Sequence, residues 1–321
     1  TAEAEYLNIN CEGSKQLVDI ILDRAKNLLD KVNVYELKIQ SYNSQNRLGE
    51  ALSTGLEVLK MLGVSLPKNP KPINIIAGII KTKISLGLKG IEDLANRPEM
   101  TNPDKKAAMR ILSGIFSTAI HCQPKLVPLL AFTTVNLSIK YGNSPYSSVG
   151  YVYYGVVMCR QGNISLGYQF GQLAIRMLDK FPSRSTASRV YEVFSGLIEH
   201  QKADIKSGLG YLMKSFQIGM ETGDLEYATY AICRYSSHKL WMGEPLDLVE
   251  EETGKYVKLM QQVKQEVCEQ YISIERQTAI NLRGKSVEPC HLVGDSFNEV
   301  EILPVWIEAK IFFLVSFVYN A

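Results

Sequence analysis

Apolar residues recur at steps of three and four along most of the chain, which is the spacing of one helical face. Near the N-terminus this pattern, with charged residues between the apolar ones, comprises Leu17, Ile20, Ile21, Ala25, Leu28 and Leu29. Two-residue Asn-Gly or Asp-Gly hairpin turns and regular short runs of alternating polarity do not occur. The pattern therefore predicts an all-α protein that begins with an amphipathic helix.

The predicted helices come in pairs joined by short polar turns. In residues 34–67 a helix with aromatic residues is followed by a turn at 45–47 and a second helix that ends before Pro67. Similar pairs occupy 104–141, 151–182 and the stretch that begins at Tyr191. Glycines such as Gly167 and Gly208 lie where a second helix would cross the first, and close backbone approach needs such small residues.

This repetition predicts the architecture of residues 1–283. We expect a right-handed superhelical array of antiparallel helix pairs, a degenerate tetratricopeptide-like solenoid. The crossing glycines are spaced more widely than the ~34 residues of a regular tetratricopeptide repeat, so the array is irregular. Two further long helices are predicted at 225–242 and 245–283.

Two stretches interrupt the helical pattern. Prolines are closely spaced at 67–72, and residues 284–304 contain two glycines, Pro289 and Pro304, which predicts an irregular loop. Residues 305–321 resume the helical spacing and are expected to start a further repeat that is truncated. Because natural solenoids end in polar capping helices, the apolar end of this segment predicts that the natural protein continues.

The amino-acid composition limits the partners and the cellular location that are expected for the protein. The 35 basic and 33 acidic side chains leave a formal charge of +2, which gives no global attraction to nucleic acid. The longest apolar run, 311–319, is shorter than the ~20 residues of a spanning helix, so no stable membrane insertion is expected. The six cysteines are scattered without a Cys-x-x-Cys pair, which predicts reduced thiols in a cytoplasmic protein.

Motifs that carry chemistry are scarce. Residues 279–286, Ala-Ile-Asn-Leu-Arg-Gly-Lys-Ser, fit a relaxed phosphate-binding pattern, but such a loop needs a strand before it and a helix after it. Here a helical pattern precedes the motif and Pro289 follows it, which favours a helix end capped by Gly284. The pairs His121-Cys122 and Cys290-His291 lack a second metal ligand at short spacing. No catalytic residue, cofactor or metal site is therefore expected.

The segment between Glu57 and Glu92 contains no acidic residue. It carries lysines among isoleucines, namely Lys60, Lys68, Lys71, Lys81, Lys83 and Lys89. A basic amphipathic helix of this kind binds an anionic bilayer or an acidic partner, or else forms a solvated face over a core. The solvated face over a core is favoured, because most basic amphipathic helices are of this kind.

Polar and aromatic residues on the first helix of each pair are candidates for a concave recognition surface, as in solenoids that bind proteins. These candidates are Lys38, Asn43, Tyr153 and Arg234. The expected partners are therefore proteins, bound without a cofactor.

Four runs resemble the helical region of very large bacterial sensor proteins: ALSTGLEVLKMLGVSLP, IEDLANRPEM, ETGDLEYATYAICRY and ILPVWIEAKIFF. In that family a serine/threonine kinase and a signal-transduction ATPase precede the tetratricopeptide-like region, and a GAF domain and a histidine kinase follow it. The resemblance implies a non-catalytic sensor or scaffold that couples ATPase and kinase domains. The alternative is a helical regulatory domain that binds a nucleotide or small molecule, with the 284–304 loop as a lid.

Overall fold

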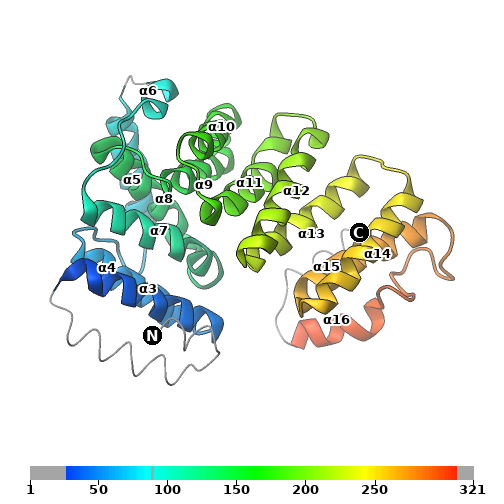
Figure 1. The fold of residues 1–321 in the computed structure, drawn as a ribbon. Helices are drawn as coiled ribbons and strands as arrows, with labels where there is room; N and C mark the ends of the chain where they lie inside the picture. Colours follow the sequence, from blue (N-terminus) through cyan, green and yellow to red (C-terminus); the bar gives the residue numbers. More distant parts are fainter. Residues whose placement is uncertain (1–26, 88–89, 309–321) are drawn as a thin grey trace. The chain divides into compact units, whose positions relative to one another are not determined.

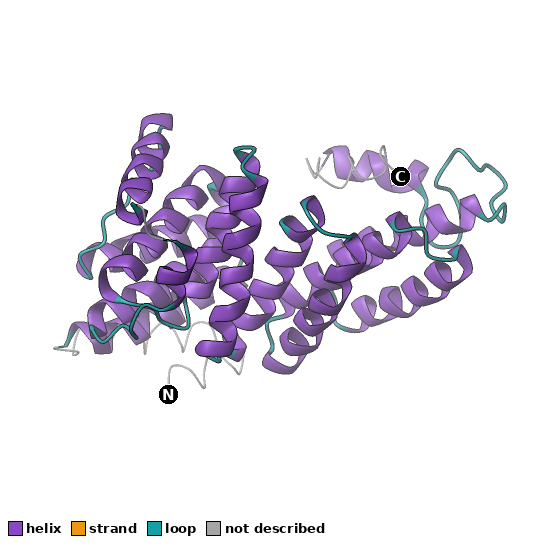
Figure 2. Ribbon diagram, turned by 90° about the horizontal axis from the view of Figure 1, so that it is seen from above, coloured by secondary structure: helices purple, strands orange, loops and turns teal. Residues whose placement is uncertain are grey.

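The computed structural model describes residues 27–87 and 90–308 (Figure 1). All regular structure in these ranges is helical (Figure 2), apart from the isolated bridges Glu99–Asn143 and Val293–Asn298. The all-α fold class, built from antiparallel helix pairs of the tetratricopeptide-like type, is confirmed. Of the opening helix predicted from Leu17 to Leu29, residues 17–26 lie outside the described residues, as do Lys89 and the apolar run 311–319. Leu28 and Leu29 begin the helix Leu28–Ser44.

The chain divides into two compact units, residues 1–186 (unit 1) and 187–321 (unit 2). The described helices of unit 1 are α3 (Leu28–Ser44), α4 (Leu48–Met61), α5 (Pro72–Leu86), α6 (Ile91–Ala95), α7 (Pro103–Cys122), η1 (Pro124–Leu126), α8 (Val127–Tyr141), α9 (Ser147–Arg160) and α10 (Ile164–Lys180). Helix α11 (Arg184–Leu197) begins at the boundary, and unit 2 continues with η2 (Glu199–Gln201), α12 (Ile205–Thr222), α13 (Leu225–Trp241), α14 (Leu246–Gln262), α15 (Glu266–Leu282) and α16 (Glu299–Glu308).

Unit 1 is a stack of helix pairs. Helices α3 and α4, α7 and α8, and α9 and α10 pair, and α4 packs against α7 as α8 packs against α9. Its largest fully buried side chains include Phe116, Tyr151, Tyr154 and Phe170, with the rings of Tyr154 and Phe170 4.4 Å apart. Large aromatic rings bury much area per residue, so each of these side chains fills more of the interior of this stack than one of its many buried aliphatic side chains does.

Where the two helices of a pair cross, their backbones lie too close together for a residue larger than glycine. A Cβ added to Gly167 of α10 would lie 2.7 Å from the backbone oxygen of Gly155 in α9. In unit 2 a Cβ on Gly208 of α12 would lie 3.0 Å from Glu199 Oε2 and would collide with Ser195 Oγ. Small residues therefore set the distance between the two helices of a pair, as the sequence predicted.

Most predicted turns are confirmed, but the single helix predicted at 245–283 is wrong. The chain folds back between α14 and α15, and Lys264 takes the left-handed backbone conformation with φ of 56°. Neither glycine nor proline marks this turn. The two helices instead pack along each other, and burial of their facing sides outweighs the cost of one strained residue.

The segment predicted as a loop at 284–304 is also shorter in the structure. Helix α16 begins at Glu299, where the side chain of Asn298 accepts a hydrogen bond of 3.1 Å from the backbone N–H of Val300. This is the usual capping role of asparagine. Pro304, taken in the sequence as the end of the loop, lies inside α16.

A long connection joins α4 to α7 and contains α5 and α6. Asn143, fully buried in the α8–α9 turn, secures its second half: its Nδ2 donates to Leu94 O at 2.7 Å, and its backbone exchanges hydrogen bonds with Pro98 and Met100. Tyr151 OH donates to Asn143 Oδ1 at 2.7 Å. One satisfied side chain thus fixes the path of the connection into α7.

Candidate functional site

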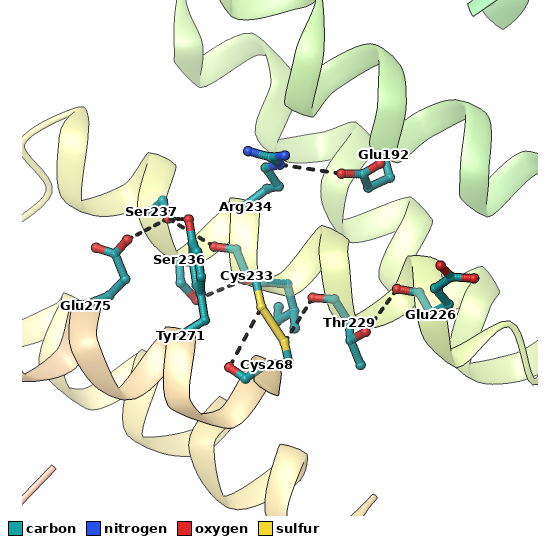
Figure 3. Close-up of a disulfide and its surroundings, with 11 residues drawn as sticks. Glu192, Glu226, Thr229, Cys233, Arg234, Ser236, Ser237, Cys268, Tyr271 and Glu275 are labelled. Atoms are coloured by element: carbon teal, nitrogen blue, oxygen red, sulfur yellow. Dashed lines mark hydrogen bonds and ion pairs between the residues drawn. A yellow bond between two sulfur atoms is a disulfide. The ribbon is translucent and has the colours of Figure 1, made fainter. Parts of the chain in front are cut away.

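The first helices of unit 2, α11, α13 and α15, bring a group of polar side chains together (Figure 3). The contacts between α13 and α15 join residues about one repeat apart: Cys233 and Cys268 are separated by 35 positions and Ser237 and Tyr271 by 34. A tetratricopeptide repeat has a period of ~34 residues. Equivalent positions of successive first helices therefore meet, and we call this group the first-helix network.

Arg234 and Glu192 form the part of the network between α13 and α11. Arg234 Nε lies 3.5 Å from Glu192 Oε1, and the arginine side chain is 36% exposed whereas that of the glutamate is 5% exposed. Burial raises the pKa of Glu192, although the charge of Arg234 opposes the shift. Gly196 lies beside the arginine, and a Cβ there would be 3.1 Å from Arg234 Cδ. The glycine thus leaves room for the guanidinium.

Ser237, Tyr271 and Glu275 form the part between α13 and α15 (Figure 3). Ser237 Oγ donates to Glu275 Oε1 at 2.7 Å and lies 2.9 Å from Tyr271 OH. Because a serine has one proton, the tyrosine donates to the serine in this chain. Burial raises the pKa of Tyr271 to about 12 and raises the pKa of the Glu275 carboxyl.

Two histidines adjoin the network. His238 of α13 is 2% exposed, and its ring centroid lies 6.0 Å from that of His200. Burial, reinforced by His200 and Arg234, lowers the pKa of His238 to about 4, so this imidazole is neutral at neutral pH. Its Nδ1 is buried without a hydrogen-bond partner in the described part of the chain.

A disulfide between Cys233 and Cys268 lies in the same contact, with the two Cα atoms 6.4 Å apart. This corrects the prediction that all the cysteines are reduced thiols. The sequence signal existed, because the two residues stand one repeat apart on successive first helices. Cys122, Cys159 and Cys290 are free, and Cys11 is outside the described residues.

The chemistry of the network favours a structural and recognition role. A tyrosine with a raised pKa is a weak nucleophile at neutral pH, and an imidazole with a strongly lowered pKa is a weak general acid. The carboxyls accept hydrogen bonds from side chains of neighbouring helices. The network therefore fixes the register of three helices and presents Arg234 at its solvent edge.

The four predicted surface residues lie in two different units. Lys38 and Asn43 lie half-buried on α3, and Thr118 Oγ1 of α7 donates to Asn43 Oδ1 at 3.1 Å. Tyr153 is 3% exposed and stacks on Phe116 with ring centroids 4.4 Å apart, so it belongs to the core. The placement of Tyr153 on a recognition surface is therefore corrected. Arg234 lies in unit 2 and the other three in unit 1.

The phosphate-loop pattern at 279–286 is a helix end. Gly284 follows α15 with φ of 69°, and its N–H donates to Asn281 O at 2.9 Å. Lys285 Nζ pairs with Glu250 at 3.1 Å, and residues 285–298 form no helix. The interpretation as a helix C-terminus capped by glycine is confirmed.

An open cleft of 710 Å³ lies between α14, α15 and the loop before α16. Its lining is mostly charged and includes Glu250, Lys258, Arg276, Arg283 and Asp295. Arg276 Nε donates to the backbone carbonyl of Glu250 at 3.3 Å, and the carboxylate of Glu250 pairs with Arg283. The charges of Glu250 and Arg283 thus offset each other within the wall.

The two His–Cys pairs of the sequence lie in different units. No group of three or more histidine, cysteine, aspartate or glutamate side chains suited to a metal ion occurs in the described part of the chain. His291 Nδ1 instead lies 2.7 Å from Glu299 Oε1. Among the helices that the structure describes, none is long and apolar enough to cross a membrane.

Comparison with known proteins finds two signalling proteins to which this chain is similar. The chain is similar to a signal transduction ATPase with numerous domains that carries a tetratricopeptide repeat sensor, from Pyrococcus horikoshii: TM-score 0.54, 13% identity, 98% of this chain and 42% of that one. It is 23% identical over 281 residues to hybrid signal transduction histidine kinase G of Dictyostelium discoideum, which covers 81% of this chain. The chain spans 8% of that kinase's length. No family model matches.

Proposed function

We propose that this chain is a non-catalytic helical-repeat sensor or scaffold segment of a larger signalling kinase, in which it binds protein partners and couples ATPase and kinase domains. The observation that carries the proposal is the likeness of nearly the whole chain to a protein with a tetratricopeptide repeat sensor. The sequence similarity to a segment of a signal transduction histidine kinase supports the same role. Helical repeats bind partners and transmit changes of curvature.

The recognition residues of this proposal lie on first helices. Lys38 and Asn43 of α3 and Arg234 of α13 remain the candidates, each within its own unit. Arg234 is the most informative of them because its partly exposed side chain pairs with the buried Glu192. A partner carboxylate that approaches Arg234 competes with Glu192, so binding at this edge is coupled to the first-helix network.

The experiment that tests the proposal uses the parent protein. Kinase activity is measured with and without the physiological stimulus in the intact protein and in a form that lacks residues 27–308. We expect the deletion to keep basal activity and abolish the response to the stimulus. An unchanged response, or reading frames beside Thr1 and Ala321 that encode neither kinase nor ATPase, would overturn the proposal.

The proposal also includes a cellular location and a class of partner for this chain. A segment of a kinase that uses ATP works in the cytoplasm, and its near-zero net charge of +2 does not favour nucleic acid as a partner. Fractionation of cells with an antibody to the chain tests this placement. Recovery from a secreted fraction would contradict it.

The charged cleft between α14 and α15 supports a second candidate function, a regulatory domain that binds a small molecule or nucleotide. Its volume of 710 Å³ is in the range of ligand pockets, and Asp295 and Ser296 of the loop before α16 line it. Saturable thermal stabilisation by ATP or another charged metabolite is expected if the cleft is a site. Stabilisation that persists in Arg276→Ala would place the ligand elsewhere.

A further inference from the structure

Helix α5 exposes a continuous apolar stripe. Four isoleucines spaced by three or four residues are largely solvent-accessible: Ile73 (65%), Ile76 (51%), Ile80 (53%) and Ile84 (74%). At 100° per residue these positions fall within about 80° of arc on the helix surface. A stripe of this kind is unusual in a folded protein, since large exposed apolar side chains normally occur singly.

The opposite side of α5 is the one that packs. Thr82 is fully buried and its hydroxyl accepts a hydrogen bond of 2.8 Å from Asn136 Nδ2 of α8, while a Cβ on Gly78 would collide with the ring of Phe132. Among the described helices, α8 is the one against which α5 packs extensively. The isoleucine stripe is therefore not the core-facing side, which corrects the favoured interpretation of this segment as a solvated face over a core.

Lysines border the stripe on both sides. Lys81 and Lys83 are exposed and stand on opposite flanks of the isoleucine row by helical angle. Lys71 is exposed at the start of the helix. Between Glu57 and Glu92 the sequence has no acidic residue that would repel an anionic surface. The stripe with these lysines is called the α5 face.

We propose that the α5 face binds the surface of an anionic lipid bilayer. The isoleucines enter the boundary between headgroups and acyl chains, and the flanking lysines extend to the lipid phosphates. Among the described helices α5 packs extensively on α8 alone, so the face on its other side is convex. Partner helices commonly dock into a hydrophobic groove, whereas a bilayer accepts a protruding helix.

Charge argues against a second copy of this chain as the occupant. An α5 face paired with itself would bring lysines together with no acidic side chain on the helix to neutralise them. The bilayer proposal does not depend on the proposed signalling function. It places this chain at the surface of a membrane, which none of the described helices crosses.

The test is sedimentation of the full chain with vesicles of phosphatidylcholine alone and of equal parts phosphatidylcholine and phosphatidylglycerol. We expect binding to the anionic vesicles only, weakening as salt is added because surface charges are screened. The double variant Lys81→Gln/Lys83→Gln should bind roughly 30-fold more weakly, from the attraction of about two surface lysines. The double variant Ile76→Gln/Ile80→Gln should lose at least roughly tenfold through its smaller apolar area.

Matched controls change equally exposed residues elsewhere. Lys125→Gln removes a surface charge in unit 1, and Val287→Gln changes a side chain that is 96% exposed in unit 2. Both should bind like the unmodified chain. All the substituted side chains are exposed, so circular dichroism should show unchanged helicity.

Several outcomes would overturn the proposal. These are no sedimentation with anionic vesicles at low salt, equal binding to both vesicle types, or anionic binding that the isoleucine substitutions leave intact. If the unmodified chain does not bind vesicles but self-associates, and Ile76→Gln/Ile80→Gln abolishes the self-association, the face is a dimer interface. Binding of a synthetic amphipathic peptide flanked by glutamates, without vesicle binding, would make it a protein site.

Discussion

At the scale of single residues, unit 2 concentrates ionisable groups away from water. Glu192, Glu199 and Glu275 are each less than 7% exposed, and burial raises the pKa of all three carboxyls. A buried carboxylate is costly unless it is paired and hydrogen-bonded. Hydroxyl donors and Arg234 offset part of this cost, so the stability of unit 2 depends on pH.

The pH dependence is tested at Glu275. Its folded-state pKa lies above the ordinary value of 4.5, so the stabilisation it contributes is present below that pH and is lost as the pH rises through the folded-state pKa. Glu275→Gln keeps an acceptor for Ser237 and carries no charge. As the pH is raised from 4.5 to mildly alkaline values, we expect the melting temperature of this variant to increase relative to that of the unmodified chain. The exposed Glu288→Gln is the control, and a parallel trend in both variants would contradict the explanation.

A second prediction at this scale concerns the disulfide. Replacing Cys268 by serine opens a link between residues 35 positions apart and should lower the free energy of unfolding by about 4 kcal/mol, from the loop-closure relation. Thermal unfolding with and without reductant measures the effect, and Cys233→Ser/Cys268→Ser should be insensitive to the reductant.

Alkylation of denatured, unreduced protein from cells checks the link directly. Mass spectrometry should find Cys233 and Cys268 in one cross-linked peptide pair. Disulfides are rare in a reducing cytoplasm, so the measurement also bears on localisation. Full alkylation of both residues would show that the link is absent in the cell.

At the scale of helices, glycine spacing determines how closely a pair packs. Gly208 and Gly210 stand on the same helix, α12, but a Cβ meets Ser195 and Glu199 at the first position and nothing within 4 Å at the second. The two sites thus separate the effect of crowding from that of helix propensity.

We predict opposite effects for the two alanine substitutions. Gly208→Ala should destabilise the protein by about 1–3 kcal/mol because the helices must move apart. Gly210→Ala should stabilise it by about 0.5–1 kcal/mol because alanine favours the helix. Urea unfolding monitored by circular dichroism measures both, and equal signs would contradict the role of Gly208 in the crossing.

Much of the helix pattern was predictable from local signals, and the exceptions have physical causes. Turns marked by glycine or by short polar runs, such as Gln45–Arg47 and Gly162, were found from the sequence. The turn at Lys264 was not, because packing of α14 on α15 imposes it without a breaker residue. Burial of Tyr153 was missed for a similar reason, since helical spacing does not reveal which tyrosine stacks on Phe116.

The site was less predictable than the fold. Arg234 was selected as a surface residue, whereas its partner Glu192 and the Ser237–Glu275 contact were not foreseen. These pairs join residues on successive first helices, and only a register based on the repeat period would have aligned them. The isoleucine row of α5 was visible in the sequence, but its exposure depended on which side met α8.

At the scale of the whole molecule, the division into two units predicts unfolding in more than one step. The two tryptophans, Trp241 and Trp306, both lie in unit 2, whereas helices fill both units. Helical repeats contact their neighbours only, so distant parts unfold with limited cooperativity. Tryptophan fluorescence therefore reports on unit 2, and circular dichroism on the whole chain.

We predict that the two signals give different midpoints in urea. The fluorescence transition should follow unit 2 and shift with Glu275→Gln, while part of the circular dichroism transition should stay where it is. Superimposable curves in every variant would show that the chain unfolds as one cooperative body.

The long connection between α4 and α7 has a consequence for protein engineering. Lys105 Nζ near the start of α7 donates to the carbonyl of Leu62 just past the end of α4 at 2.6 Å, so the ends of this detour are neighbours. A short linker from Leu62 to Asn102 would excise α5 and α6 in a single step and leave the stacked pairs joined in their order. The excision would uncover Phe132 and remove the partners of Asn143 at Leu94, Pro98 and Met100, so a shortened unit 1 needs substitutions at both Phe132 and Asn143.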